Sequence, residues 1–234
     1  MLPRPWAICS NMPSIKQIIS LVKKEIDLEW KNRAAINGIL LYTFSTIFIC
    51  YLGLGVKTGR LSPSTWNALF WIVIVFAAIN AIAKSFGQEG SGRNLYYYWL
   101  TGPEEIIISK IIYNIMLMGV LALFAYSFYS FVLDNPVQDN LLFILAIILG
   151  STGFATTLTL MSGIASKVPG NNTLMAILSI PLIIPLLLML IRLSKNALDG
   201  LDWSVSMDEI IILSALNVLS CALSYILFPY LWKS

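Results

Sequence analysis

The sequence predicts an all-α membrane protein with six transmembrane helices, an N-terminal amphipathic helix at the membrane surface and a polar cytoplasmic segment between the second and third spans. Of its 234 residues, 58% are apolar and only 12% are charged, against roughly 25% charged in an ordinary soluble domain. The apolar residues fall in runs that can cross a bilayer, which takes about 20 residues per helix. The basic residues are divided unequally between the two sets of connections, as is typical of membrane proteins. The predicted spans are 34–54, 65–84, 106–133, 141–165, 173–193 and 210–231.

Two segments precede the first span. Residues 1–13 show no periodicity and no apolar core long enough for a signal peptide, so we expect either a disordered tail or a start codon placed too far upstream. Residues 14–234 are expected to form one membrane domain that begins with a helix over 14–33. This helix should lie in the inner membrane interface, because apolar residues recur along it with a helical period, at Ile15, Ile18, Ile19, Val22, Ile26 and Trp30.

Glu29 and Arg33 lie four residues apart on the apolar face of this helix. An exposed pair at that spacing contributes only about 0.2–0.5 kcal/mol. We interpret the two as a local ion pair at the elbow into the first span, with a ligand site as the alternative.

The orientation follows from the basic residues. With the N-terminus inside, eleven Lys and Arg residues face the cytoplasm and four face outside, which agrees with the positive-inside rule. Both termini and residues 85–105 are then cytoplasmic, and the acidic residues near the last connection are outside. The eleven are Arg4, Lys16, Lys23, Lys24, Lys31, Arg33, Lys84, Arg93, Lys110, Lys167 and Lys233, and the four are Lys57, Arg60, Arg192 and Lys195.

The residues that are missing exclude several functions. The chain has no histidine, its three cysteines Cys9, Cys50 and Cys221 show no metal spacing, and no nucleophile and base constellation indicates an enzyme. No ionisable residue lies well inside a span, which argues against a proton-coupled carrier. Nothing points to a metal site or a nucleic-acid partner.

Within the spans, polar and proline residues are the informative ones. Asn80, Asn114 and Asn217 are most simply interhelical hydrogen-bonding groups. Pro181 and Pro185 each remove a backbone hydrogen bond from the fifth span, so this helix should be bent. The bend can be a hinge or a fixed shape, and the sequence favours neither.

The polar segment 85–105 separates two long apolar runs. Its apolar Phe86, Leu95, Trp99 and Leu100 alternate with charged residues and glycines. We interpret it as one or two short amphipathic helices at the membrane surface, on which a soluble partner can push. The alternative is an interfacial loop whose aromatic rings lie at headgroup level.

Three stretches carry a family resemblance. They are KKEIDLEWKNR followed by NGILLY; the segment with Phe86, Glu89, Gly92 and Leu95, followed by Gly102, Pro103, Lys110 and Asn114; and LMAILSIPLIIPLLL. From about Ile15 onward the chain resembles the CcmB-type haem exporter permeases of cytochrome c maturation, which are relatives of the ABC-2 exporter membrane subunits. The aromatic Tyr96 to Tyr98, and Arg93 with Asn94, depart from the family pattern.

The resemblance implies an ABC-2-like permease subunit in the bacterial inner membrane, without an ATPase site of its own. A separate cytoplasmic ABC ATPase would bind ATP, and further partners would be a haem-handling membrane subunit, a small membrane subunit and, indirectly, a periplasmic haem chaperone. Haem would be transported or handed over rather than bound tightly as a cofactor. The absence of a GxxxxGK[ST] phosphate loop fits a partner ATPase. An ABC-2 permease for a lipid, drug or glycan is the alternative.

The same resemblance assigns contact with the ATPase to the segment 85–105. The implied coupling residues are Phe86, Glu89, Gly92, Leu95, Trp99 and Pro103. The apolar members would dock into a groove of the ATPase, and Glu89 would meet a basic rim.

Overall fold

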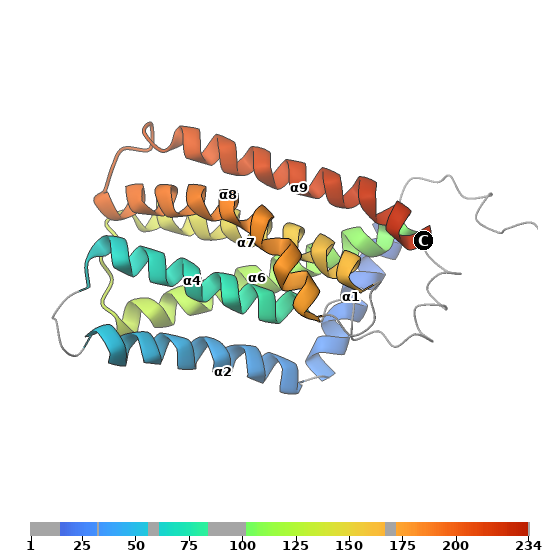
Figure 1. Ribbon diagram of the computed structural model, residues 1–234, viewed down its shortest axis with the longest axis horizontal. Helices are drawn as coiled ribbons and strands as arrows, with labels where there is room; N and C mark the ends of the chain where they lie inside the picture. The colour runs from blue at the N-terminus through green and yellow to red at the C-terminus, as the bar shows by residue number, and fades with distance from the viewer. Residues whose placement is uncertain (1–14, 32, 56–60, 84–101, 167–171, 234) are drawn as a thin grey trace, which may run out of the picture.

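The computed structural model describes residues 15–31, 33–55, 61–83, 102–166 and 172–233. In this part of the chain the regular elements are helices, without strands. Figure 1 shows long helices running side by side, with α1 crossing one end of them. In chain order the elements are α1 (Ile15–Lys31), α2 (Arg33–Cys50), a π-helical turn η2 (Tyr51–Gly55), α4 (Pro63–Ile82), α6 (Pro103–Val132), α7 (Asn140–Ala165), α8 (Asn172–Asp199) and α9 (Met207–Lys233).

Five of these helices, α4, α6, α7, α8 and α9, are long and apolar enough to cross a membrane. The predicted all-helical membrane class is therefore confirmed. The first predicted span corresponds to α2 together with η2, and the apolar stretch there, Asn37–Gly53, is shorter than the other five. The fifth predicted span ends at 193, whereas α8 continues to Asp199, so the last connection is shorter than the sequence suggests.

The helices place the connections at two ends of the bundle. One end, called here the α1 end, holds α1, the start of α6 and the last turns of α9 (Figure 1). The opposite end holds the turns 133–139 and 200–206. There, Asp139 caps α7 by accepting from the amides of Leu141 and Leu142, and Trp203 Nε1 donates to its other carboxylate oxygen at 2.8 Å.

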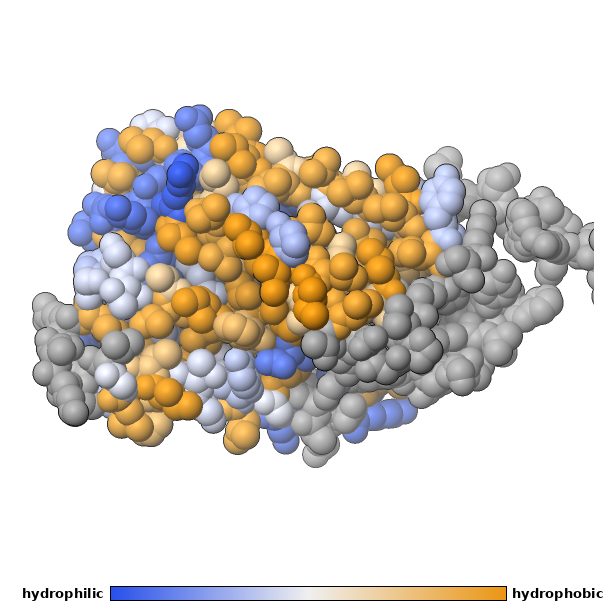
Figure 2. All heavy atoms as spheres, viewed as in Figure 1, coloured by the Kyte–Doolittle hydropathy of each residue, from blue (hydrophilic) through white to orange (hydrophobic). Residues whose placement is uncertain are grey.

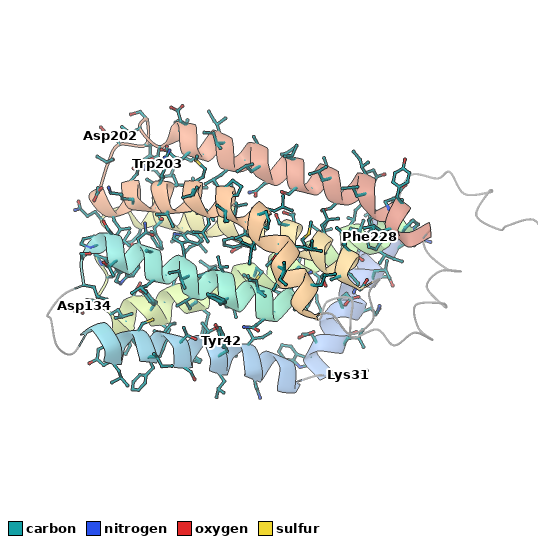
Figure 3. All side chains as sticks on the ribbon, viewed as in Figure 1. Lys31, Tyr42, Asp134, Asp202, Trp203 and Phe228 are labelled. Carbon is teal, nitrogen blue, oxygen red and sulfur yellow. The ribbon has the colours of Figure 1, made fainter. Side chains whose placement is uncertain are left out.

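The surface of the bundle has the polarity of a membrane protein. Figure 2 shows apolar side chains over its middle and hydrophilic ones gathered at the opposite end, near Asp202 and Trp203, which Figure 3 labels. Exposed apolar residues such as Val120, Phe131 and Val218 lie on the long helices.

The centre of the bundle is α7, which packs on α4, α6, α8 and α9. Its apolar window is 67% buried. Glycine allows the neighbours to approach closely, because a Cβ on Gly150 would lie 2.8 Å from the Trp71 ring, and one on Gly153 would clash with Leu186 Cδ1. Leu186 follows Pro185, so Gly153 makes room for the bent helix α8.

Hydrogen bonds between helices supplement this packing. Asn114 Nδ2 donates to Thr159 Oγ1 at 2.7 Å, and Asn217 Nδ2 donates to the Leu149 carbonyl at 3.0 Å. The interhelical role predicted for these two asparagines is confirmed. For Asn80 it is wrong, because this exposed side chain donates to the Phe76 carbonyl of its own helix.

α8 changes direction along its length (Figure 1), as its two internal prolines predict. A proline in a helix removes one backbone hydrogen bond and its ring clashes with the carbonyl four residues earlier. Pro181 and Pro185 both lie on the exposed side of the helix. Whether the bend flexes stays a prediction.

We predict that Gly153→Ala destabilises the bundle. The added Cβ would clash with Leu186 and lie 2.6 Å from Asn217 Oδ1, and overpacking of this kind typically costs about 1–3 kcal/mol. Gly119→Ala on α6 is the matched control, because its Cβ would meet no atom within 4 Å. Thermal unfolding of the purified protein in detergent should show a lower midpoint for Gly153→Ala only. Equal midpoints for the two variants would contradict the close approach.

Candidate coupling site

The structure describes only a small part of the predicted polar segment 85–105. Phe86, Glu89, Gly92, Leu95 and Trp99 lie outside the described residues, so their predicted contact with an ATPase stays a prediction. Pro103 is described, and it is the first residue of α6. Residues 103–105 thus belong to the apolar helix α6, and the junction of this helix with α1 follows the segment directly.

The first residues of α6 stabilise the start of this helix. Proline at the first helical position has a preset φ and lacks an amide that would be left unpaired there. Glu105 reaches back, and the Gly102 amide donates to its Oε2 at 3.0 Å, which is one half of a capping box. Glu104 and Glu105 also place negative charge at the helix N-terminus, where the helix dipole favours it.

An ion pair joins α1 to α6 within this junction. Lys110 Nζ lies 3.3 Å from Glu25 Oε1, with the two side chains 1% and 13% exposed. Lys24 Nζ lies 3.3 Å from the same oxygen. An unpaired buried charge is strongly destabilising, so Lys110 requires a carboxylate beside it.

A second polar contact lies two turns earlier on α1. With its nitrogen directed at the carboxylate, the Gln17 amide lies 2.6 Å from Glu105 Oε1. Gln17, Leu21 and Glu25 follow one another at four-residue spacing, which places them on one face of α1, and Leu21 is buried between them. Two polar contacts with an apolar residue between them fix the crossing of α1 over α6.

The remaining predicted site residues are the pair of Glu29 and Arg33 and the two prolines of α8. Glu29 is half-buried on α1, but the side chain of Arg33 lies outside the described residues, so their ion pair remains a prediction. Pro181 and Pro185 lie on α8, and the site described here has no contribution from them.

The sequence analysis missed the pair of Lys110 and Glu25. A signal was present, because Lys110 is the only basic residue in the apolar run that forms the third span, and Glu25 falls on a partly apolar side of α1. A cation at such a position predicts a carboxylate partner. The choice of that partner depends on how α1 crosses α6, which residue spacing does not give.

The contacts at the junction are structural ones that join two helices. In the described residues no group of three or more Cys, Asp or Glu side chains could hold a metal ion, and the contacts of Lys110 and Glu105 are ion pairs and hydrogen bonds. Such contacts fix one helix to another.

Comparison with protein families then decides the identity. The model of the CcmB family, described as CcmB protein, matches residues 16–230. The chain belongs to the CcmB family. No match was found among curated proteins.

Membership in the CcmB family fixes the general function. The chain is a membrane component of the haem export system for cytochrome c maturation, and a transporter subunit of a multi-subunit ABC-type complex that includes other membrane and ATPase subunits. Together with the five apolar helices, membership indicates a multi-pass inner-membrane protein.

We predict that Lys110→Met destabilises this CcmB protein, because Glu25 loses the partner that shields it from the apolar junction. Breaking a fully buried pair costs about 3–5 kcal/mol, and we expect less here because Lys24 also contacts Glu25. The double variant Lys110→Met with Glu25→Met should recover part of the loss, because apolar side chains can replace an ion pair at little cost. Thermal unfolding measures both, with Lys23→Met on the exposed side of α1 as the control. A double variant less stable than Lys110→Met would argue against the pair.

Proposed function

We propose that the chain is the permease subunit through which a separate cytoplasmic ABC ATPase drives haem export or haem delivery to a periplasmic chaperone. The other subunits of the complex would be a haem-handling membrane subunit and a small membrane subunit. The family match supports the haem substrate. Haem is cargo in this proposal, and ATP is bound by the partner.

The buried pair of Lys110 and Glu25 is the observation that carries the coupling role. It lies in the first turns of α6, directly after the polar segment, and it attaches α1 to the same turns. A push on residues 85–105 would therefore act on α1 and α6 together. A single loosely packed helix would absorb the push by tilting alone.

The movement then passes into the bundle. α6 packs on α7 and α9, so a tilt of α6 changes its packing on both. The proline bend of α8 is suited to act as the hinge in this rearrangement, because neither proline donates a backbone hydrogen bond that would resist bending.

The proposed orientation has both termini and the α1 end in the cytoplasm, and it includes α2 as the sixth span. The asymmetry of eleven basic residues against four supports it. α2 lies beside α4 and α6 and runs along the bundle in Figure 1. α2 and the π-helical turn that follows it together approach the length of a span.

Capture of the ATPase tests the proposal. The tagged chain is expressed with its partner subunits in cells that lack the native copy, in the forms Phe86→Ala, Leu95→Ala and Tyr97→Ala. Truncation of a buried interface anchor costs about 2–4 kcal/mol of association, so the first two variants should lose the ATPase and c-type cytochromes. Tyr97→Ala at matched expression is the control, with a smaller effect. Because the ATPase is cytoplasmic, its capture also tests the orientation.

Two results would contradict the proposal. Normal ATPase capture and normal cytochrome c maturation in the Phe86→Ala, Leu95→Ala double variant would show that the segment 85–105 does not couple the ATPase to the permease. Normal c-type cytochromes in cells that lack the chain altogether would show that haem is not its substrate. This result would favour an ABC-2 exporter of a lipid, drug or glycan.

A further inference from the structure

The C-terminal part of α9 contacts the junction between α1 and α6. Phe228 is 2% exposed and packs in a small apolar cluster with Leu21 of α1 and Ile106, Ile107 and Ile111 of α6. Figure 3 labels Phe228 where α9 comes close to α1 and the start of α6. We call these five residues the junction cluster. The cluster joins three elements that are far apart in the sequence.

A hydrogen bond strengthens this contact. Tyr225 Oη donates to Glu104 Oε2 at 3.0 Å. Tyr225 precedes Phe228 by three residues, so the two share a face of α9. The adjacent carboxylates of α6 therefore have different partners, because Glu104 accepts from α9 whereas Glu105 faces Gln17 of α1.

The rest of α9 is little buried, which makes the contact at Phe228 notable. Among the described side chains from Met207 to Leu231, the buried ones are Leu213, Ser224 and Phe228. The apolar window of α9 is 11% buried, against 67% for α7. Phe228 is thus one of the few side chains that this helix buries fully.

The geometry explains why a third helix matters at this crossing. The pair of Lys110 and Glu25 and the contact of Gln17 with Glu105 attach α1 along one face. Leu21 lies between these contacts, and Phe228 packs against the same cluster from α9. A side chain inserted from a third direction opposes rotation of α1 about its contacts with α6.

From these contacts we propose that Phe228 and Tyr225 are positioning residues for coupling. They hold α1 and the first turns of α6 in one orientation, so that the C-terminal part of α9 moves with them. The role in haem export rests on the function proposed above, whereas the positioning of α1 does not. At its other end α9 follows Ser206, which accepts from Asn196 of α8 at 3.1 Å, so α9 connects the α1 end with the opposite end.

The test uses the complete complex with the variants Phe228→Ala, Phe228→Leu and Tyr225→Phe. Tyr230→Ala is the matched control, because this aromatic residue of the same helix is 73% exposed. Two quantities are measured: hydrogen exchange of the α1 amides, and haem delivered to the periplasmic chaperone per ATP hydrolysed.

We expect Phe228→Ala to speed exchange in α1 about tenfold, with exchange in α7 unchanged, because local opening becomes easier where the packing is lost. The amount of haem delivered per ATP hydrolysed should fall about tenfold while the ATPase stays bound. When α1 and the start of α6 are misplaced, ATP is hydrolysed without moving the helices productively. Phe228→Leu should restore most of both quantities, and Tyr225→Phe should change each about threefold in the same direction. Tyr230→Ala should behave as wild type.

Wild-type exchange in α1 together with a wild-type ratio of haem to ATP in Phe228→Ala would overturn the inference. If Phe228→Ala does not accumulate, Tyr225→Phe decides by the same readouts, because it removes a single hydroxyl. Failure of the proposed function looks different: the wild-type complex would deliver haem equally well with an inactivated ATPase. In that case the exchange readout still decides the positioning of α1, with unchanged exchange overturning it.

Discussion

The ion pair between Lys110 and Glu25 is the constraint on which the junction depends. An ammonium group on a side chain that is 1% exposed requires a carboxylate beside it, because an uncompensated buried charge costs several kcal/mol. α1 cannot leave α6 without separating these charges. The contact of Gln17 with Glu105 and the burial of Leu21 act in the same direction. α1 and the first turns of α6 therefore behave as one mechanical unit.

The remaining helices form the frame against which this unit can move. α7 lies at its centre, with glycines that allow Trp71 and Leu186 to approach closely. The hydrogen bonds of Asn114 and Asn217 connect α7 to α6 and α9, and such bonds contribute only about 0.6–2 kcal/mol each in membranes. Contacts of that strength hold a defined arrangement and still permit the rearrangement proposed above.

The features that the sequence predicts correctly are those that depend on hydropathy and on chemistry within one helix. Apolar runs predicted the long helices, and internal prolines predicted the bend of α8, because both effects are local. The role of Asn80 was predicted wrongly and the partner of Lys110 was missed, because these depend on which side of a helix faces a neighbour. The gathering of Phe228 and Leu21 into one cluster with residues of α6 could not be predicted either, since residues at opposite ends of the chain come together there only after the bundle has formed. Pro103 was placed in the polar segment, although its preset φ makes it the start of α6.

The central claim is that α1 and α6 move together during the ATP cycle. Spin labels at exposed positions test it in the complete complex, after replacement of Cys9, Cys50 and Cys221 by serine. One pair joins Lys23 of α1 to Met116 of α6, and the other joins Met116 to Leu188 of α8. Between the nucleotide-free and ATP-trapped states, the first distance should stay constant and the second should shift. A shift between α1 and α6, with the distance from α6 to α8 unchanged, would contradict the account.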